Sequence, residues 1–372
     1  MNAEEINEKL QKSFEEYKKN LKKPSILITG GTGVGKSSLI NKIFGKNVAK
    51  EGIGKPVTSL IEKYESDDLG VILYDSPGYE IGIEKTKKFE EDVINIKEKE
   101  NINLVWYCIQ ASGSRITDFD IETIKKFIDN RLPTSIILTK CDLVSEDASK
   151  NFKEAINLIE KISHIDIYET SSTSEDEFFT EELKKLISKS IEKLPDTLRD
   201  GFISAQKIHL KEKWNRAHIA IVQHITGTFG IAIATTTLIP IADAEVFLEK
   251  QKEMIARILS IYDLDVLENI FKWTKGKLMS NSFIKSLASN MTKIIPIVGI
   301  IIKGGISYEI AKRFTIALGE AINTSCYKIY QSILNEDKSP EEITQLFGDM
   351  VKRYTEKYYK INEELENYKI PD

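Results

Sequence analysis

Short apolar runs alternate with helical patterns over the first half of the chain, and helical patterns alone fill the second half. Each apolar run is of the type that forms a buried strand. Strands alternating with helices predict an α/β fold, in which helices wrap a mostly parallel six-stranded sheet. The predicted strands are Ser25–Thr29, Leu60–Glu65, Val71–Tyr74, Leu104–Gln110, Ser135–Thr139 and Asp166–Thr170.

The pattern changes in the sequence EKLPDTLRDG, where Pro195, Asp196 and Gly201 mark a boundary. Beyond it the patterns are typical of helices and not of strands. The first residues mix acidic and basic side chains and predict a solvated amphipathic helix that ends near Pro24. The expected parts are an N-terminal helix over 1–23, an α/β domain over 24–194 and an all-helical domain over 196–372 with an apolar helical hairpin.

The stretch Ala217–Ala242 carries no formal charge. At ~1.5 Å per residue it is long enough to cross a bilayer. Gln223 and His224 dilute its apolar character, however, and Pro240 breaks its helix. The next apolar run, Ile294–Ile302, is too short to return across a membrane. These features favour a folded helical core, and they leave open a permanent span or a hairpin that faces a membrane in one state only.

Composition limits the environment and the partners of the chain. Its 372 residues predict two domains. A net charge of −5 argues against non-specific nucleic-acid binding, so we expect no nucleic-acid partner. The three cysteines show no metal-like spacing, and the N-terminal residues lack the apolar segment of a secretory signal. We therefore expect a cytoplasmic protein, with peripheral or conditional membrane contact as an open alternative.

A glycine-rich turn joins the first predicted strand to a helical pattern. It has the spacing Gly30-x-x-x-x-Gly35-Lys36-Ser37, which is typical of phosphate-binding loops. Glycines let backbone N–H groups approach phosphate oxygens, Lys36 can reach the β- and γ-phosphates, and the Ser37 hydroxyl can ligate Mg²⁺. The predicted phosphate-binding residues are Gly30, Gly31, Thr32, Gly33, Val34, Gly35, Lys36, Ser37 and Ser38.

Two further segments offer groups for Mg²⁺ and for the γ-phosphate. The spacing Asp75-x-x-Gly78 follows a predicted strand, where the carboxylate can hold Mg²⁺ through water and the glycine N–H can turn towards the γ-phosphate. Thr58 lies in a glycine-rich loop between the phosphate-binding turn and this strand, where its hydroxyl can close over Mg²⁺. The predicted metal ligands are Ser37, Thr58 and Asp75, and the predicted catalytic residues are Lys36, Thr58 and Gly78.

The segment Thr139-Lys140-Cys141-Asp142 ends a β-branched strand and is suited to reading a base. A carboxylate at Asp142 can accept hydrogen bonds from both N1–H and N2–H₂ of guanine, whereas adenine offers no such pair of donors. The expected ligands are therefore GTP and GDP. Lys140 would lie along the base, and a backbone N–H near Ser171 and Ser172 could meet guanine O6. The predicted base-binding residues are Thr139, Lys140, Asp142, Ser171 and Ser172.

Together these segments resemble the five G-boxes of Era-like and Ras-like P-loop GTPases, over roughly residues 24 to 194. The TKxD form of the fourth box is closer to dynamin-like and immunity-related GTPases. The resemblance implies a Mg²⁺-dependent enzyme that converts GTP to GDP and phosphate. The segments that carry it are Gly30–Ser37, Thr58, Asp75–Gly78, Thr139–Asp142 and Ser171–Ser172.

Two departures from that family bear on hydrolysis. Tyr79 stands where Ras-like enzymes carry a water-orienting glutamine, and Gly33 stands where potassium-activated relatives carry an asparagine. We therefore expect slow intrinsic turnover. The attacking water would then be positioned by the Thr58 loop, by a partner protein or by self-association through the GTPase domain, and Arg115 is a candidate arginine finger.

The second half also resembles a known family. Leu238–Asp265 and Lys293–Phe314 are similar to the helical domain of YcjF-like GTPase-associated proteins, over roughly residues 200 to 330. This resemblance implies an architecture, with membrane contact open, rather than a reaction. We therefore predict a switch protein that couples nucleotide state to a helical effector domain. The alternative is a membrane-associated structural or remodelling protein whose assembly the nucleotide controls, and a role in ribosome assembly is weakened by the lack of a basic module.

Overall fold

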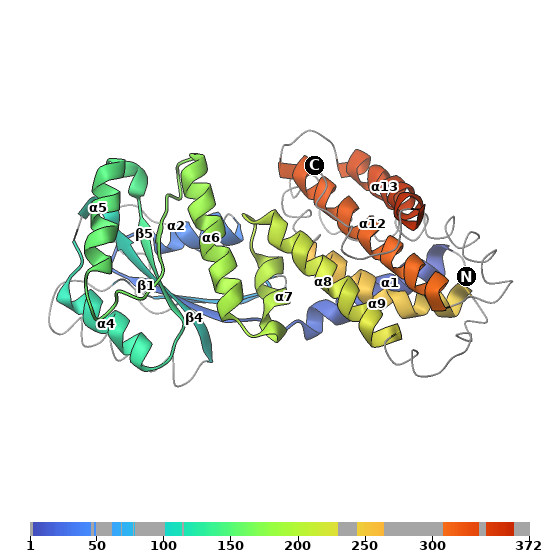
Figure 1. Ribbon diagram of the computed structural model, residues 1–372, viewed down its shortest axis with the longest axis horizontal. Helices are drawn as coiled ribbons and strands as arrows, with labels where there is room; N and C mark the ends of the chain where they lie inside the picture. Colours follow the sequence, from blue (N-terminus) through green and yellow to red (C-terminus); the bar gives the residue numbers. More distant parts are fainter. Residues whose placement is uncertain are drawn as a thin grey trace. The chain divides into compact units, whose positions relative to one another are not determined.

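The computed structural model describes residues 3–45, 48–49, 62–67, 69–76, 78, 101–113, 115–229, 244–263, 308–334 and 340–360. The chain divides into two compact units (Figure 1). The sheet unit is Lys22–His209, and the helical unit combines Met1–Leu21 with Leu210–Asp372.

The sheet unit contains a six-stranded sheet with the strand order β2-β3-β1-β4-β5-β6. Strand β2 pairs antiparallel with β3, and the other four pairings are parallel. The predicted mostly parallel six-stranded sheet is therefore confirmed. Its strands are β1 (Ser25–Gly30), β2 (Glu62–Tyr64), β3 (Ile72–Asp75), β4 (Ile102–Gln110), β5 (Thr134–Thr139) and β6 (Ile167–Glu169).

Helices cover both faces of this sheet (Figure 1). Central strands that are buried on both faces need apolar side chains at nearly every position, which explains the continuous apolar runs of β1, β4 and β5. The helices of the unit are α2 (Lys36–Phe44), α4 (Asp118–Asp129), α5 (Glu146–Asn157), α6 (Glu177–Lys193) and α7 (Asp196–Ala205).

Strand β4 shows how the two layers form, because successive side chains of a strand point to opposite faces. The Trp106 ring stacks on Phe44 of α2 at 5.8 Å and meets Phe202 of α7 edge-on at 6.3 Å. The next residue, Tyr107, faces the other way and donates its hydroxyl to Asp120 of α4 at 2.8 Å. Helix α7 therefore belongs to the core of the sheet unit, which extends beyond the expected boundary near residue 195 to His209.

Side chains at the helix starts fix where the covering helices begin. Thr117 Oγ1 accepts a hydrogen bond from the N–H of Asp120, and the Asp120 side chain accepts one from the Thr117 N–H, which together form a capping box. Ser145 caps α5 and Asp176 caps α6, and each side chain accepts a hydrogen bond from a backbone N–H group of the first turn. Each cap satisfies donors that the helix itself leaves unpaired.

The helical unit consists, in its described residues, of helices only. Helix α12 packs against α8, α9 and α13, and α1 packs against α9. Leu10 and Phe14 of α1 are buried, so the prediction that this helix is solvated is wrong for its apolar face. The reason is that α9 covers that face. The helices are α1 (Ala3–Asn20), α8 (Leu210–Phe229), α9 (Ala244–Tyr262), α12 (Tyr308–Leu334) and α13 (Pro340–Lys360).

The uncharged stretch Ala217–Ala242 is described only over its first part, which belongs to α8. There Ala217, Ala220 and Ile221 are buried in the helical unit. Residues 230–242 lie outside the described residues, as does the second apolar run of the predicted hairpin. None of the described helices combines the length and the hydropathy that a membrane span requires.

A buried polar network joins three helices of this unit. His218 of α8 lies 2.5 Å from Glu320 Oε1 of α12, and the Trp214 ring stacks on the imidazole at 5.6 Å. Asn323 donates to Glu320 Oε2 at 3.4 Å and accepts from the Tyr262 hydroxyl of α9 at 2.7 Å. The hydrogen bond to Glu320 raises the pKa of His218, while burial acts in the opposite direction.

This network predicts a pH dependence of stability. Because the folded-state pKa of His218 is raised above its unfolded value of about 6.5, the stabilisation by the protonated pair is fully present below that pH. It is lost as the pH rises through the folded-state pKa. In urea unfolding followed by circular dichroism, His218→Gln should therefore cost more stability at pH 5.5 than at pH 8.5. The exposed His164→Gln is the control, and an equal cost of His218→Gln at both pH values would contradict the assignment.

Candidate nucleotide-binding site

The glycine-rich turn connects β1 to α2. Gly30, Gly33 and Gly35 have φ angles of 134°, 71° and 102°, a region that residues with a Cβ rarely occupy. Gly30 also lies directly against β4, because a Cβ built on it would be 2.1 Å from the carbonyl oxygen of Cys108. Glycine at this position is therefore required both by the turn and by the neighbouring strand.

Lys36 begins α2 and reaches back to the turn. Its Nζ donates hydrogen bonds to the carbonyl oxygens of Gly31 at 2.9 Å and Gly30 at 3.3 Å. The side chain is buried, and burial lowers the pKa of its ammonium group, while the nearby Asp75 carboxylate opposes that shift. Because neutral carbonyl groups accept these bonds, an anion at the turn would gain a buried counter-charge.

Asp75 ends β3 beside the first turn of α2 and is completely buried. Ser37 donates its hydroxyl to Asp75 Oδ2 at 2.7 Å, whereas Oδ1 has no hydrogen-bond partner among the described residues. Burial raises the pKa of this carboxyl group, and the Ser37 hydrogen bond and the Lys36 charge act in the opposite direction. A hydroxyl beside a carboxylate oxygen without a partner is a set of oxygen ligands that fits Mg²⁺.

The described residues by themselves do not complete the ligand shell of such an ion. The described residues contain no group of three or more His, Cys, Asp or Glu side chains that could hold a metal ion. Mg²⁺ commonly takes one or two protein ligands and completes its shell with phosphate oxygens and water. Thr58, the third predicted ligand, lies outside the described residues, as does Tyr79.

Gly78 lies against the glycine-rich turn. A Cβ built on Gly78 would be 2.2 Å from both the Cα and the N atom of Thr32, so the two backbones are in contact. Thr32 Oγ1 also donates a hydrogen bond to the Gly78 carbonyl oxygen at 2.9 Å. The structure thus brings the predicted γ-phosphate glycine to the predicted phosphate-binding turn.

Lys140, which follows β5, connects the glycine-rich turn to the end of β4. Its Nζ donates to the Gly33 carbonyl oxygen at 2.7 Å and to Gln110 Oε1 at 3.0 Å. The Thr139 hydroxyl donates to the carbonyl oxygen of Val34. The predicted base-binding and phosphate-binding segments therefore form one continuous site.

Asp142 is exposed next to the loop that follows β6. Thr173 donates its hydroxyl to Asp142 Oδ2 at 3.2 Å. Ser171 Oγ accepts hydrogen bonds from the backbone N–H groups of Thr173 at 3.2 Å and Ser174 at 2.9 Å. Ser172, half-buried, lies within this small turn. The structure thus places the carboxylate that the sequence predicts to read the base beside the loop that the sequence predicts to meet guanine O6.

Sequence reasoning missed two polar residues of this site, Gln110 and Thr173. Gln110 holds the Lys140 ammonium group, and Thr173 holds the Asp142 carboxylate. Neither belongs to a spacing pattern. The only signal in the sequence is position, since Gln110 ends a predicted strand and Thr173 follows the Ser171–Ser172 pair directly.

Comparison with known proteins finds relatives of the sheet unit. The family model described as "50S ribosome-binding GTPase" matches residues 25–140. The probable GTP-binding protein EngB of Cytophaga hutchinsonii is 32% identical over 146 residues, which make up 37% of this chain and 71% of that protein. The chain belongs to the P-loop GTPase family.

Other relatives of this P-loop GTPase differ in length. Cell division control protein 10 of Saccharomyces cerevisiae is 26% identical over 166 residues, and the match covers 36% of the chain and 51% of the yeast protein. The chain thus spans about half the length of that relative. The crystal structure of Aquifex aeolicus Era bound to GDP and AlF₄⁻ has 20% identity and a TM-score of 0.37, over 47% of this chain and 58% of the other.

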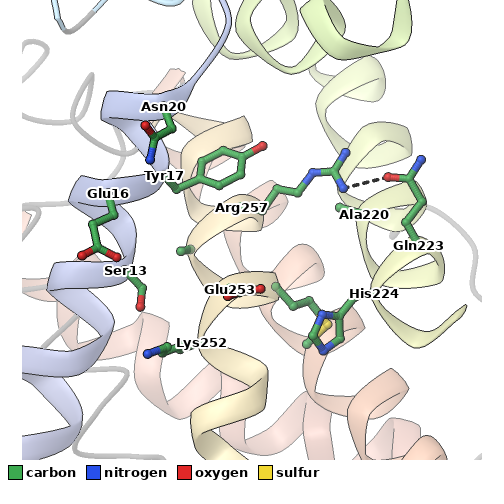
Figure 2. A pocket seen from close by; sticks show the side chains of 12 residues that line it. Ser13, Glu16, Tyr17, Asn20, Ala220, Gln223, His224, Lys252, Glu253 and Arg257 are labelled. Atoms are coloured by element: carbon green, nitrogen blue, oxygen red, sulfur yellow. Dashed lines mark hydrogen bonds between the residues drawn. The ribbon is translucent and has the colours of Figure 1, made fainter. Parts of the chain in front are cut away.

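The helical unit of this P-loop GTPase contains a cavity. This cavity, with a volume of about 470 Å³, opens between α1, α8 and α9 (Figure 2). Glu16 and Lys252 line it, and Arg257 Nη1 donates to Gln223 Oε1 at 2.7 Å in its wall. None of the predicted site residues lines this cavity. The candidate nucleotide site is therefore the edge of the sheet at the glycine-rich turn.

The contact between Gly30 and β4 predicts different tolerances within the turn. Gly30→Ala should destabilise the protein by roughly 1–3 kcal/mol more than Gly33→Ala, because both substitutions strain a left-handed backbone and only the first meets a carbonyl oxygen. Nothing lies within 4 Å of a Cβ at Gly33. Urea unfolding of both variants measures the difference. Equal losses would show that β4 does not constrain the turn.

Proposed function

We propose that this chain is a Mg²⁺-dependent GTP-binding and GTP-hydrolysing switch that couples its nucleotide state to the helical unit. The observation that carries the proposal is the arrangement around Asp75. Among the described residues, a buried ammonium group at Lys36, a hydroxyl at Ser37 and a carboxylate oxygen without a partner meet at one glycine-rich turn. Membership of the P-loop GTPase family supports the same reaction class.

Phosphate binding rests on the turn and on Lys36. Backbone N–H groups of a glycine-rich turn that leads into a helix favour anions, and Lys36 adds a full positive charge in a buried position. Ser37 and Asp75 would hold Mg²⁺, which when bound neutralises charge on the β- and γ-phosphates. The N–H of Gly78 is the group that would report the presence of a γ-phosphate.

Guanine selection rests on Asp142. Its carboxylate would accept hydrogen bonds from N1–H and N2–H₂ of the base, and Thr173 supports one of its two oxygens. Lys140 would cover the base while it remains bonded to the turn and to Gln110. A base without that pair of donors would leave the carboxylate unpaired, which costs binding energy.

Hydrolysis by this chain alone is expected to be slow, because Tyr79 lacks the donor and acceptor pair of a glutamine amide. We therefore propose that a partner protein or self-association through the sheet unit positions the attacking water. The helical unit would contact a protein effector or a membrane, and the chain would act in the cytoplasm. A membrane-associated remodelling role remains the second proposal, and it rests on the uncharged stretch Ala217–Ala242.

The phosphate site can be tested at Lys36. Lys36→Ala should weaken GTP and GDP binding by roughly 100-fold or more, because the polyphosphate would lose its buried counter-charge. Calorimetric titration measures both affinities. Lys42→Ala, on the same helix, is the matched control and should bind as the native protein does. Undiminished binding by Lys36→Ala would remove the phosphate-site assignment.

The base site can be tested at Asp142. Asp142→Asn should weaken GTP binding at least ~10-fold and favour xanthosine triphosphate, whose carbonyl the new amide can bond. Competition against a fluorescent guanine nucleotide gives the ratio of the two affinities. Asp147→Asn, exposed on α5, should leave that ratio unchanged. If ATP competes as well as GTP on the native protein, Asp142 does not read the base.

A further inference from the structure

The contact between Thr32 and Gly78 closes the space between two loops of the site. Thr32 lies inside the phosphate-binding turn, and Gly78 follows β3. A Cβ at Gly78 would meet Thr32 N and Cα at 2.2 Å and the carbonyl carbon of Gly31 at 2.6 Å. These distances are far below van der Waals contact, so only the missing side chain of a glycine allows the approach. A phosphoryl group bound by both loops would lie between them, where the backbones of Gly78 and Thr32 are in contact.

Ser76, which follows β3, is held in place by two hydrogen bonds to β1. The N–H of Ser76 donates to the carbonyl oxygen of Ile28 at 3.0 Å, and its hydroxyl donates to Thr29 Oγ1 at 3.0 Å. These bonds extend the β1–β3 pairing past Asp75. Separation of the two loops therefore concerns the contact at Gly78 rather than the strand that carries Asp75.

A side-chain hydrogen bond spans the closed contact between Thr32 and Gly78. Thr32 Oγ1 donates to the Gly78 carbonyl oxygen at 2.9 Å. Thr32 is exposed, and valine has the same outline as threonine, so a valine at this position removes the hydroxyl and keeps the shape of the side chain. The bond stabilises the closed arrangement and adds nothing to an arrangement in which the loops are apart.

We propose that Thr32 sets the preference of the site between guanosine diphosphate and triphosphate, by holding Gly78 against the phosphate-binding turn until a γ-phosphate separates them. The inference rests on the proposed function. A diphosphate leaves the contact closed, whereas a triphosphate must break the Thr32 bond to reach the Gly78 N–H. When a ligand binds only one of two arrangements, its apparent affinity is the intrinsic affinity multiplied by the fraction of molecules in that arrangement. Thr32 therefore lowers the affinity for GTP and leaves that for GDP unchanged.

The test compares two variants that differ at this hydroxyl. Thr32→Val removes the donor and keeps the branched shape, and Thr32→Ser keeps the donor and removes the methyl group. Dissociation constants for GDP and for the non-hydrolysable triphosphate GppNHp are measured by competition against a fluorescent GDP analogue in Mg²⁺ buffer. Loss of one exposed neutral hydrogen bond should shift the affinity ratio towards the triphosphate by about 2- to 10-fold in Thr32→Val. The ratio in Thr32→Ser should stay close to the native value.

The outcomes separate the inference from the function on which it rests. A native ratio in Thr32→Val, or an equal shift in both variants, would overturn the role of the hydroxyl while nucleotide binding stands. A shift that comes from weaker GDP binding, with GppNHp unchanged, would also overturn it. If the native protein binds neither nucleotide, the proposed function fails, and the inference fails with it.

Discussion

A buried ammonium group and a buried carboxylate meet at the glycine-rich turn, and the described residues leave one oxygen of that carboxylate without a hydrogen-bond partner. Lys36 bonds neutral carbonyl oxygens, and Asp75 uses one oxygen of two. Removing charges from water is costly unless each is paired and hydrogen-bonded. An anion against Lys36 and a cation against Asp75 would remove that cost. This arrangement of charges therefore supports the proposal that a polyphosphate binds here together with a metal ion.

The sheet brings these charges to one place because its strands are parallel. The carboxyl ends of β1, β3, β5 and β6 lie at one edge, and each is followed by a segment of the site, which is where open α/β sheets bind ligands. The close approach of Gly30 to Cys108 then sets the turn against β4. Lys140 and Gln110 complete the link, since they join β5 and β4 to the turn. The geometry of the site is thus a consequence of strand order.

Strand order also explains which features the sequence could predict. Central parallel strands are buried on both faces, so they appear as unbroken apolar runs, and all six strands were placed within a few residues of their bounds. The apolar face of an amphipathic helix, by contrast, predicts that the helix packs against another element, but it does not identify that element. Helix α1 finds its partner in α9, more than 200 positions along the chain. Gln110 and Thr173 could not be predicted for a related reason. A single polar residue at a strand end forms no repeating pattern along the sequence.

The two units satisfy their buried charges in different ways. In the helical unit His218, Glu320 and Asn323 bond one another, so this network needs no ligand. In the sheet unit Asp75 keeps an oxygen without a partner among the described residues. A ligand that binds only the folded state stabilises it in proportion to the logarithm of its concentration over Kd. Bound nucleotide would therefore stabilise the sheet unit, and it would leave the hydrogen-bond network of His218, Glu320 and Asn323 unchanged. Under the proposed switch function, the stability that varies with bound nucleotide would therefore lie in the sheet unit, at the buried carboxylate of Asp75.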